Sequence, residues 1–216
     1  MKVKICGIHI KEDVKMVASL QPDYMGFVLN CDKSPRSNSI VEVKDLVGDL
    51  EIPFVFLFVN ETEKSIIQIC TEVSPFAIQL HGDENSTTII SLKQKLPSIQ
   101  IWKAIHIPVE DSKKSFNDYL TMIQQYEKAG CDLFVLDSST KNSYGGTGVT
   151  CDWNMAAKIV QAIKTPILLA GGLTPSNVSS AINIVKPFGV DVSSGVEKTK
   201  AKKDPILVKN FINAAR

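Results

Sequence analysis

The chain has 216 residues, of which 44% are hydrophobic and 22% charged, and its formal net charge is +1. This length and composition suit one sizeable core, while the near-neutral charge without basic runs among aromatic residues argues against nucleic-acid binding. No stretch of about 18 apolar residues occurs and the N-terminus starts in a strand pattern, so we expect neither a membrane span nor a signal peptide.

The cysteines indicate the redox environment of the chain. Five are present, an odd number, with wide spacings and no C-x-x-C pair. This distribution is typical of neither a zinc site nor a disulfide framework. We therefore expect reduced thiols and a cytoplasmic protein.

Short apolar runs, rich in β-branched and aromatic residues, recur along the chain. They are apolar on both faces rather than alternating, which is typical of parallel strands covered on both sides. The expected strands are residues 3–6, 24–29, 54–59, 76–80, 99–105, 133–137, 167–170 and 190–193.

Amphipathic stretches with helical spacing lie between these runs. Asp152 and Asp204 are placed as N-caps, Thr174 is placed as a cap before Pro175, and Gly130 ends a helix as a C-terminal glycine does. The expected helices are residues 12–20, 62–73, 86–96, 115–129, 152–163, 175–185 and 204–214.

The order of these elements predicts the fold class. Eight consecutive βα units without a linker favour a closed (β/α)8 barrel, a single domain over residues 1–216. A doubly wound open sheet is the alternative.

In such a barrel the polar residues at the carboxyl ends of the strands share one mouth. Cys6 ends the first expected strand and Asp137 the sixth, a placement that suits a general acid and a general base acting on one small substrate. Taken singly, Cys6 also fits a buried structural cysteine, and Asp137 a cap or structural carboxylate. Arg36 suits a carboxylate ligand but also fits an ordinary surface position.

Glycines and serines follow the last two expected strands. Gly171 and Gly172 follow the seventh strand, and Ser193, Ser194 and Gly195 the eighth, before a short helix expected near Val196. Exposed backbone N–H groups at such a place bind phosphate in many barrels, although a pair of tight turns is the alternative. The lysine-rich residues 198–203 are expected to form a solvated loop rather than an anion site.

Eight short motifs, in order from residue 2 to about 212, resemble the phosphoribosylanthranilate isomerase family. Singly each is weak, but the ordered set is specific. The motifs are Lys4-Ile5-Cys6-Gly7-Ile8, Ser34-Pro35-Arg36, Gln79-Leu80-His81-Gly82, Leu136-Asp137-Ser138, Gly145-Gly146-Thr147-Gly148, Asp152-Trp153, Ala170-Gly171-Gly172-Leu173 and Asp191-Val192-Ser193-Ser194-Gly195-Val196-Glu197.

The resemblance implies a (β/α)8 barrel that isomerises phosphoribosylanthranilate, a small-molecule substrate, in tryptophan biosynthesis. It implies an Amadori rearrangement without metal or organic cofactor, in a monomer or homodimer. Asp137 then corresponds to the general acid and Cys6 to the general base, although Lys4 is not expected to be a partner of Cys6.

The same resemblance implies the substrate-binding residues. Arg36 would hold the anthranilate carboxylate and Asp191 would face a ribose hydroxyl, while residues 145–148 would form a lid. The remaining substrate-binding residues, mostly for the phosphate, are Gly171, Gly172, Ser193, Ser194 and His81.

Two positions depart from the family pattern. One is Cys151, before Asp152-Trp153, and the other is the polar segment Asn30-Cys31-Asp32.

Three other functions compete with this one. A related isomerase of histidine biosynthesis resembles this chain but has an aspartate where Cys6 stands. A metal-dependent phosphosugar epimerase would use His81, but no second histidine is expected at a strand end near a carboxylate. A non-catalytic phosphate-binding barrel would not need both Cys6 and Asp137.

Overall fold

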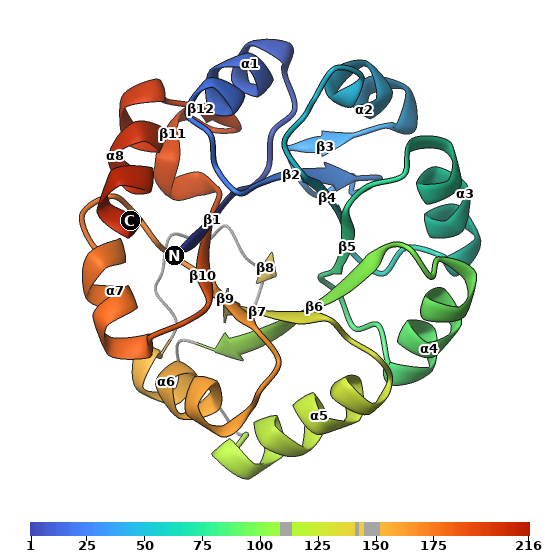
Figure 1. The fold of residues 1–216 in the computed structure, drawn as a ribbon, viewed down its shortest axis with the longest axis vertical. Coiled ribbons are helices and arrows are strands. Elements are labelled where there is room, and N and C mark those ends of the chain that lie inside the picture. The colour runs from blue at the N-terminus through green and yellow to red at the C-terminus, as the bar shows by residue number, and fades with distance from the viewer. Residues whose placement is uncertain (109–113, 141–142, 145–151) are drawn as a thin grey trace.

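The computed structural model describes residues 1–108, 114–140, 143–144 and 152–216. Within them, eight parallel strands close into a barrel that a ring of helices surrounds (Figure 1). The order around the barrel is β1-β2-β4-β5-β6-β7-β9-β10, and β10 pairs with β1 to close it. The expected (β/α)8 barrel is confirmed, and the open sheet is wrong.

The expected strands match the barrel strands, with ends shifted by three residues at most. Three short pieces were not expected: β3 (Ser37–Asn38) beside β2, β8 (Ser143–Tyr144) beside β7, and the hairpin of β11 (Glu197–Thr199) and β12 (Lys202–Lys203). The barrel strands are β1 (Lys2–Ile5), β2 (Tyr24–Leu29), β4 (Phe54–Phe58), β5 (Ala77–Leu80), β6 (Gln100–Pro108), β7 (Leu133–Thr140), β9 (Ile167–Leu169) and β10 (Gly189–Val192).

One helix was missed by the sequence analysis, α2 (Ile40–Val47). Ser39 caps it by accepting from the backbone N–H of Glu42, whose side chain accepts in return from the Ser39 backbone N–H. This reciprocal capping box is readable as Ser-x-x-Glu and was the available signal. The other helices are α1 (Lys11–Ser19), α3 (Glu63–Val73), α4 (Ser86–Lys95), α5 (Phe116–Lys128), α6 (Trp153–Ala162), α7 (Val178–Val185) and α8 (Pro205–Ala215).

The predicted helix ends are mostly confirmed. Asp152 and Asp204 both accept hydrogen bonds from the first turns of α6 and α8, and Gly130 follows α5 with a φ of 94°. The predicted start of α7 is wrong, because the helix begins after Asn177, whose Oδ1 accepts from the Thr174 backbone N–H. No helix among the described residues has the length and apolar character that crossing a membrane requires.

The barrel has apolar packing on both sides of its strands. The largest cluster contains residues of strands and helices and therefore lies between the two rings. A second cluster contains no helix residue and fills the barrel interior. Its members are Val55, Ala77, Trp102, Leu133, Val135 and Leu168 on the strands and Ala170 directly after β9. Because successive side chains of a strand point to opposite faces, these two clusters define which positions face inward. The inward-facing polar residues lie above the second cluster, toward the carboxyl ends of the strands.

Candidate active site at the barrel mouth

Lys4 is the central buried charge on one side of the mouth. Its Nζ lies 3.0 Å from Asp191 Oδ2 on β10 and 3.0 Å from Gln79 Oε1 on β5. Burial alone would lower the pKa of Lys4, but the charges of Asp191 and Cys6 raise it above its usual value. Lys4 therefore remains an ammonium ion inside the barrel.

Cys6 follows β1 and lies within reach of this ammonium. Burial raises the pKa of the Cys6 thiol, while the charge and hydrogen bonding of Lys4 act in the opposite direction. The expectation that Lys4 would not be a partner of Cys6 is thus wrong, because the long lysine side chain bridges the layer between them. Gly26 on β2 leaves the necessary room, since a Cβ there would lie 2.7 Å from Cys6 Sγ.

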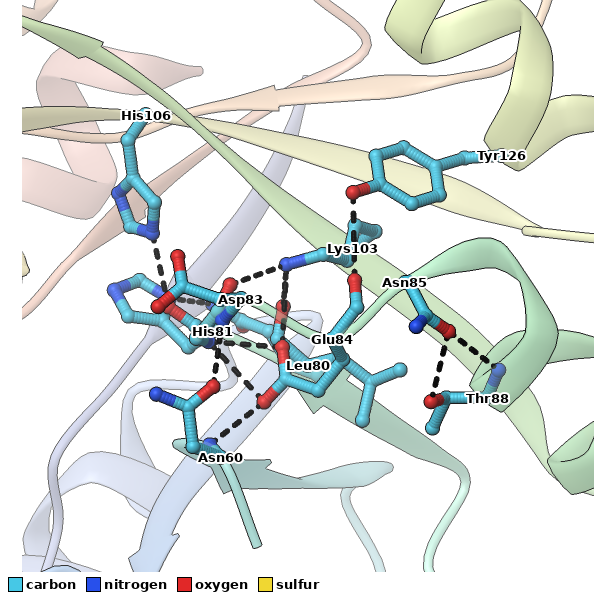
Figure 2. Close-up of polar contacts among 12 residues, drawn as sticks. Asn60, Leu80, His81, Asp83, Glu84, Asn85, Thr88, Lys103, His106 and Tyr126 are labelled. Carbon is cyan, nitrogen blue, oxygen red and sulfur yellow. Dashed lines mark hydrogen bonds and ion pairs between the residues drawn. The ribbon is translucent and has the colours of Figure 1, made fainter.

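Asp137 lies across the mouth, beside two histidines. His81 Nε2 is 3.3 Å from Asp137 Oδ2, and His106 Nε2 is 2.9 Å from the His81 carbonyl oxygen. The two imidazole rings meet edge to face, with centroids 4.9 Å apart (Figure 2). Burial and the neighbouring His81 lower the pKa of His106 to about 4, so this ring is neutral at pH 7.

The same three side chains form the one His/Cys/Asp/Glu group found among the described residues that could hold a metal ion. One potential ligand atom each of His81, His106 and Asp137 lies within 4.8 Å of the others. The expectation that no second histidine stands near a carboxylate is therefore wrong. His106 and Asp137 are register partners on adjacent strands, a pairing that only the barrel register decides.

The loops after β9 and β10 lie against each other where phosphate binding was expected. Gly171 and Gly172 have φ values of 81° and 62°, a left-handed conformation that glycine adopts without strain. A Cβ on Gly195 would lie 1.9 Å from the Leu173 carbonyl oxygen, so glycine is required for this approach. The expected short helix is a 3₁₀ turn, η1 (Ser194–Val196).

Gly7 joins this region to Arg36. It has a φ of 72°, and a Cβ on it would lie 2.5 Å from Arg36 Cδ and 2.7 Å from Ser193 Oγ. The glycine therefore lets the arginine and the serine approach each other at the mouth. In the same region Asp191 Oδ1 is buried and has no hydrogen-bond partner among the described residues. This oxygen is an acceptor available to a bound hydroxyl.

Two residues that sequence reasoning missed hold Arg36 in place. Glu197 receives a two-point contact from Arg36, with Nε–Oε1 at 2.6 Å and Nη2–Oε2 at 2.7 Å. Lys203 donates to Glu197 Oε1 at 2.9 Å and to the Ser193 carbonyl at 3.0 Å. Lys203 is buried, so the prediction of a solvated loop is wrong for it, although Lys198 and Lys200 are exposed.

The Glu197 carboxylate is expected to make stability depend on pH. Burial alone would raise the pKa of Glu197, but Arg36 and Lys203 lower it from 4.5 to about 2. Its contribution, on the order of 2–3 kcal/mol, is therefore present above pH 4.5 and lost as the pH falls toward 2. In urea unfolding from pH 6 to pH 2.5, the free-energy difference between wild type and Glu197→Gln should narrow as pH falls. The exposed Glu51→Gln is the control, and a difference that stays constant with pH would contradict the assignment.

A second buried ion pair shapes the loop that carries His81. Lys103 Nζ lies 3.2 Å from Glu84 Oε2 and donates to the carbonyls of Leu80 and Gly82 at 3.2 and 2.7 Å. Glu84 in turn accepts from the backbone N–H groups of Asn60 and Gly82 (Figure 2). This network lies on the outer side of β6 and holds the turn that follows β5.

Lys103→Met is expected to destabilise the fold by about 3 kcal/mol or more, because it leaves the buried Glu84 carboxylate without its cation. Urea unfolding measures the loss. Lys93→Met is the matched control, since its pair with Asp132 is partly exposed and should cost below about 1 kcal/mol. Equal losses in the two variants would contradict the role of the buried pair. Adding Glu84→Gln to Lys103→Met should recover part of the stability.

Three predicted features remain: the lid and the two departures from the family pattern. Residues 145–148, expected as a lid, and Cys151 lie outside the described residues. The polar segment after β2 has a structural reason at Asn30, whose φ of 49° is left-handed and suits asparagine better than an apolar residue.

The fold and site define a (β/α)8-barrel enzyme whose mouth gathers ionisable side chains beside two glycine-bearing loops. The sequence signature described as N-(5'phosphoribosyl)anthranilate (PRA) isomerase matches residues 3–214. The N-(5'-phosphoribosyl)anthranilate isomerase of Thermoanaerobacter sp. (strain X514) is 38% identical over 218 residues, covering 100% of this chain and 98% of that protein. The chain therefore belongs to the phosphoribosylanthranilate isomerase family, aldose–ketose isomerases of tryptophan biosynthesis.

Solved structures agree with this membership. Monomers generated from the dimeric phosphoribosylanthranilate isomerase of Thermotoga maritima superpose with a TM-score of 0.82 at 32% identity, covering 100% of this chain and 98% of theirs. A phosphoribosylanthranilate isomerase in complex with reduced 1-(o-carboxyphenylamino)-1-deoxyribulose 5-phosphate superposes with a TM-score of 0.80 at 31% identity, with the same coverage.

Proposed function

We propose that the chain converts N-(5'-phosphoribosyl)anthranilate to 1-(2-carboxyphenylamino)-1-deoxyribulose 5-phosphate, with Asp137 as general acid and Cys6 as general base. The observation that carries this proposal is the placement of both side chains at one mouth, with a chain of polar contacts running from Lys4 beside Cys6 to Asp137. An acid and a base on opposite sides of a small substrate match the two proton transfers of an Amadori rearrangement.

The reaction assigns one proton to each group. Asp137 donates its proton to the ribose ring oxygen, the C1–O bond breaks, and the nitrogen lone pair forms an iminium ion. The Cys6 thiolate then removes the C2 proton, and the electrons of that bond form the enolamine. Protonation at C1 and loss of the C2 hydroxyl proton complete the ketone and restore both side chains. The carboxyl must therefore carry a proton, and the thiol must have lost one, when the substrate is bound.

The substrate carries two anionic groups that suit the two ends of the site. Arg36 uses its Nε and Nη2 on Glu197, and its remaining N–H groups are proposed to bind the anthranilate carboxylate. The backbone N–H groups of Gly171, Gly172, Ser193 and Ser194 are proposed to bind the phosphate. The free oxygen of Asp191 and the ring of His81 are proposed to face the ribose hydroxyls. The ligand of the solved complex, which carries a carboxyphenyl group and a phosphate, supports this division.

The first test is turnover of phosphoribosylanthranilate formed in the cuvette by an added phosphoribosyltransferase and followed by the loss of its fluorescence. In D₂O, the product should carry deuterium at C1 to the extent that the proton held by Cys6 exchanges with solvent before the enolamine takes it. A chelator should leave the rate unchanged, whereas the alternative of metal-dependent epimerisation at the histidine cluster predicts its loss. A folded chain that does not consume the substrate would overturn the proposal.

Lys4→Gln is expected to weaken the base without removing it. The ammonium is the cation that opposes the effect of burial on the pKa of the Cys6 thiol, so its loss raises that pKa further. At pH 7 kcat/KM should fall by at least about tenfold, in keeping with a pKa rise of one unit or more, and part of it should return at higher pH. The pH–rate profile measures this effect. A uniform loss at all pH values would instead indicate a structural role for Lys4.

Further expectations concern assembly and location. We propose a cytoplasmic enzyme without metal or organic cofactor, active as a monomer or homodimer on its small-molecule substrate and independent of nucleic acid and membrane. The free thiols of Cys6, Cys31, Cys70 and Cys131 support a reducing compartment. The Thermotoga maritima relative is described as dimeric, so light scattering of this chain is the direct test of its oligomeric state.

A further inference from the structure

Four side chains form a continuous chain of polar contacts across the barrel interior, two of them hydrogen bonds and the last an ion-pair contact. Lys4 Nζ lies 3.0 Å from Gln79 Oε1, Gln79 Nε2 lies 3.0 Å from His81 Nδ1, and His81 Nε2 lies 3.3 Å from Asp137 Oδ2. Lys4 and Gln79 are fully buried, and His81 and Asp137 are nearly so. Gln79 is also held by its backbone, in register between Leu57 on β4 and Trp102 on β6.

The chemistry of the two ends fixes the direction of every bond. An ammonium ion only donates, so the amide of Gln79 must turn its oxygen toward Lys4 and its NH₂ toward His81. His81 Nδ1 must then accept, which requires a lone pair on that nitrogen. In the neutral ring the proton is consequently on Nε2, the nitrogen that lies 3.3 Å from Asp137 Oδ2.

We propose that Gln79 is a positioning residue for the reaction: oriented by Lys4, it holds His81 as the neutral tautomer whose Nε2–H orients the carboxyl of Asp137. This inference rests on the proposed function of Asp137 as the acid. A doubly protonated His81 would set an Nδ1–H against the amide NH₂. Gln79 thus disfavours the doubly protonated form of His81 through the clash of two N–H groups.

The same tautomer argues against metal binding by His81, His106 and Asp137. A ring nitrogen that carries a proton has no lone pair for a metal ion, so His81 cannot use Nε2 as a ligand while Gln79 holds it. The neutral tautomer therefore favours a proton-transfer site over a metal site at His81, His106 and Asp137.

The test replaces Gln79 by glutamate, which has the same shape but accepts at both oxygens. The carboxylate should accept from Lys4 and from a protonated His81 Nδ1, reversing the tautomer or charging the ring. The chain has 3 histidines, so ¹⁵N NMR with His81→Gln as the assignment reference reads the state of each His81 nitrogen. We expect an unprotonated Nδ1 in the wild type and a protonated Nδ1 in Gln79→Glu. kcat should fall at least about tenfold while KM stays within about twofold, the pattern of a lost transition-state interaction.

Two further variants separate this role from a structural one. Gln100→Glu makes the same change near the start of β6, where Gln100 accepts from the Trp102 indole, and should leave the His81 spectrum and kcat unchanged. Gln79→Met removes the orienting amide without adding charge and should give a mixture of His81 tautomers with an intermediate kcat.

Three outcomes would overturn the inference. A wild-type His81 with a protonated Nδ1 would contradict the tautomer directly. A fall in kcat for Gln79→Glu with an unchanged His81 spectrum would assign Gln79 a structural role. If the tautomer is confirmed but Asp137→Asn is fully active, Asp137 is not the acid and Gln79 cannot act by positioning it. That result would refute the proposed function of Asp137 and leave the tautomer of His81 as described.

Discussion

Asp137→Asn is expected to lower kcat by about 10³-fold while KM changes by less than about threefold. The carboxamide has the size of the carboxyl and can still accept from His81 Nε2, so the site should keep its shape. It cannot give a proton to the ribose ring oxygen, and ring opening then becomes the slow step. Steady-state turnover of phosphoribosylanthranilate by fluorescence measures the effect.

A surface carboxylate provides the control for this change. Asp45→Asn alters an exposed ion pair with Lys11 and should leave both kinetic constants unchanged. The free energy of unfolding of Asp137→Asn should stay close to that of the wild type. The loss of turnover could then not be explained by unfolding of the variant. A kcat within about threefold of the wild type would remove Asp137 from the role of acid.

Cys6→Ala is expected to lower kcat by about 10²- to 10⁴-fold, because the Cys6 thiolate is the group proposed to remove the C2 proton. Binding of the substrate should change little, since the sulfur contributes to proton transfer rather than to the carboxylate or phosphate contacts. Equilibrium binding of the product, measured by calorimetry, checks this separation.

Cys70→Ala is the matched control for the base. Cys70 is also a buried thiol, with its pKa raised to about 12 by burial, but it lies in α3 between the strands and the helices. Its replacement should lower stability slightly and leave kcat unchanged. Full activity of Cys6→Ala would refute the assignment of the base.

An isotope effect distinguishes the two roles from each other. The isotope effect is the ratio of kcat for the ordinary substrate to kcat for substrate deuterated at C2. Cys6→Ser should show a larger isotope effect than the wild type, since removal of the C2 proton limits its rate. Asp137→Asn should show a smaller isotope effect than the wild type, because ring opening precedes removal of the C2 proton and limits the rate of this variant. The reverse pattern would exchange the acid and the base.

Local patterns in the sequence predict most of the fold. Parallel strands buried on both faces are recognisable as apolar runs, and caps such as Asp152 and Asp204 act through residues two or three positions away. The failures are also local. The capping box at Ser39 and Glu42 marks a helix that the predicted set lacks, and the Thr174-Pro175 pair predicts a start of α7 three residues before the observed one at Val178.

The sequence by itself determined the barrel, because its strand and helix patterns arise from neighbours along the chain. It also placed Cys6 and Asp137 at strand ends. Only the tertiary structure decided what surrounds them. The reach of Lys4 to Cys6 and Gln79, the meeting of His81 with His106, and the burial of Lys203 beside Glu197 depend on register between distant strands. Charge and hydrogen bonding act through space over a few ångströms, and sequence spacing carries no information about which distant side chains come that close.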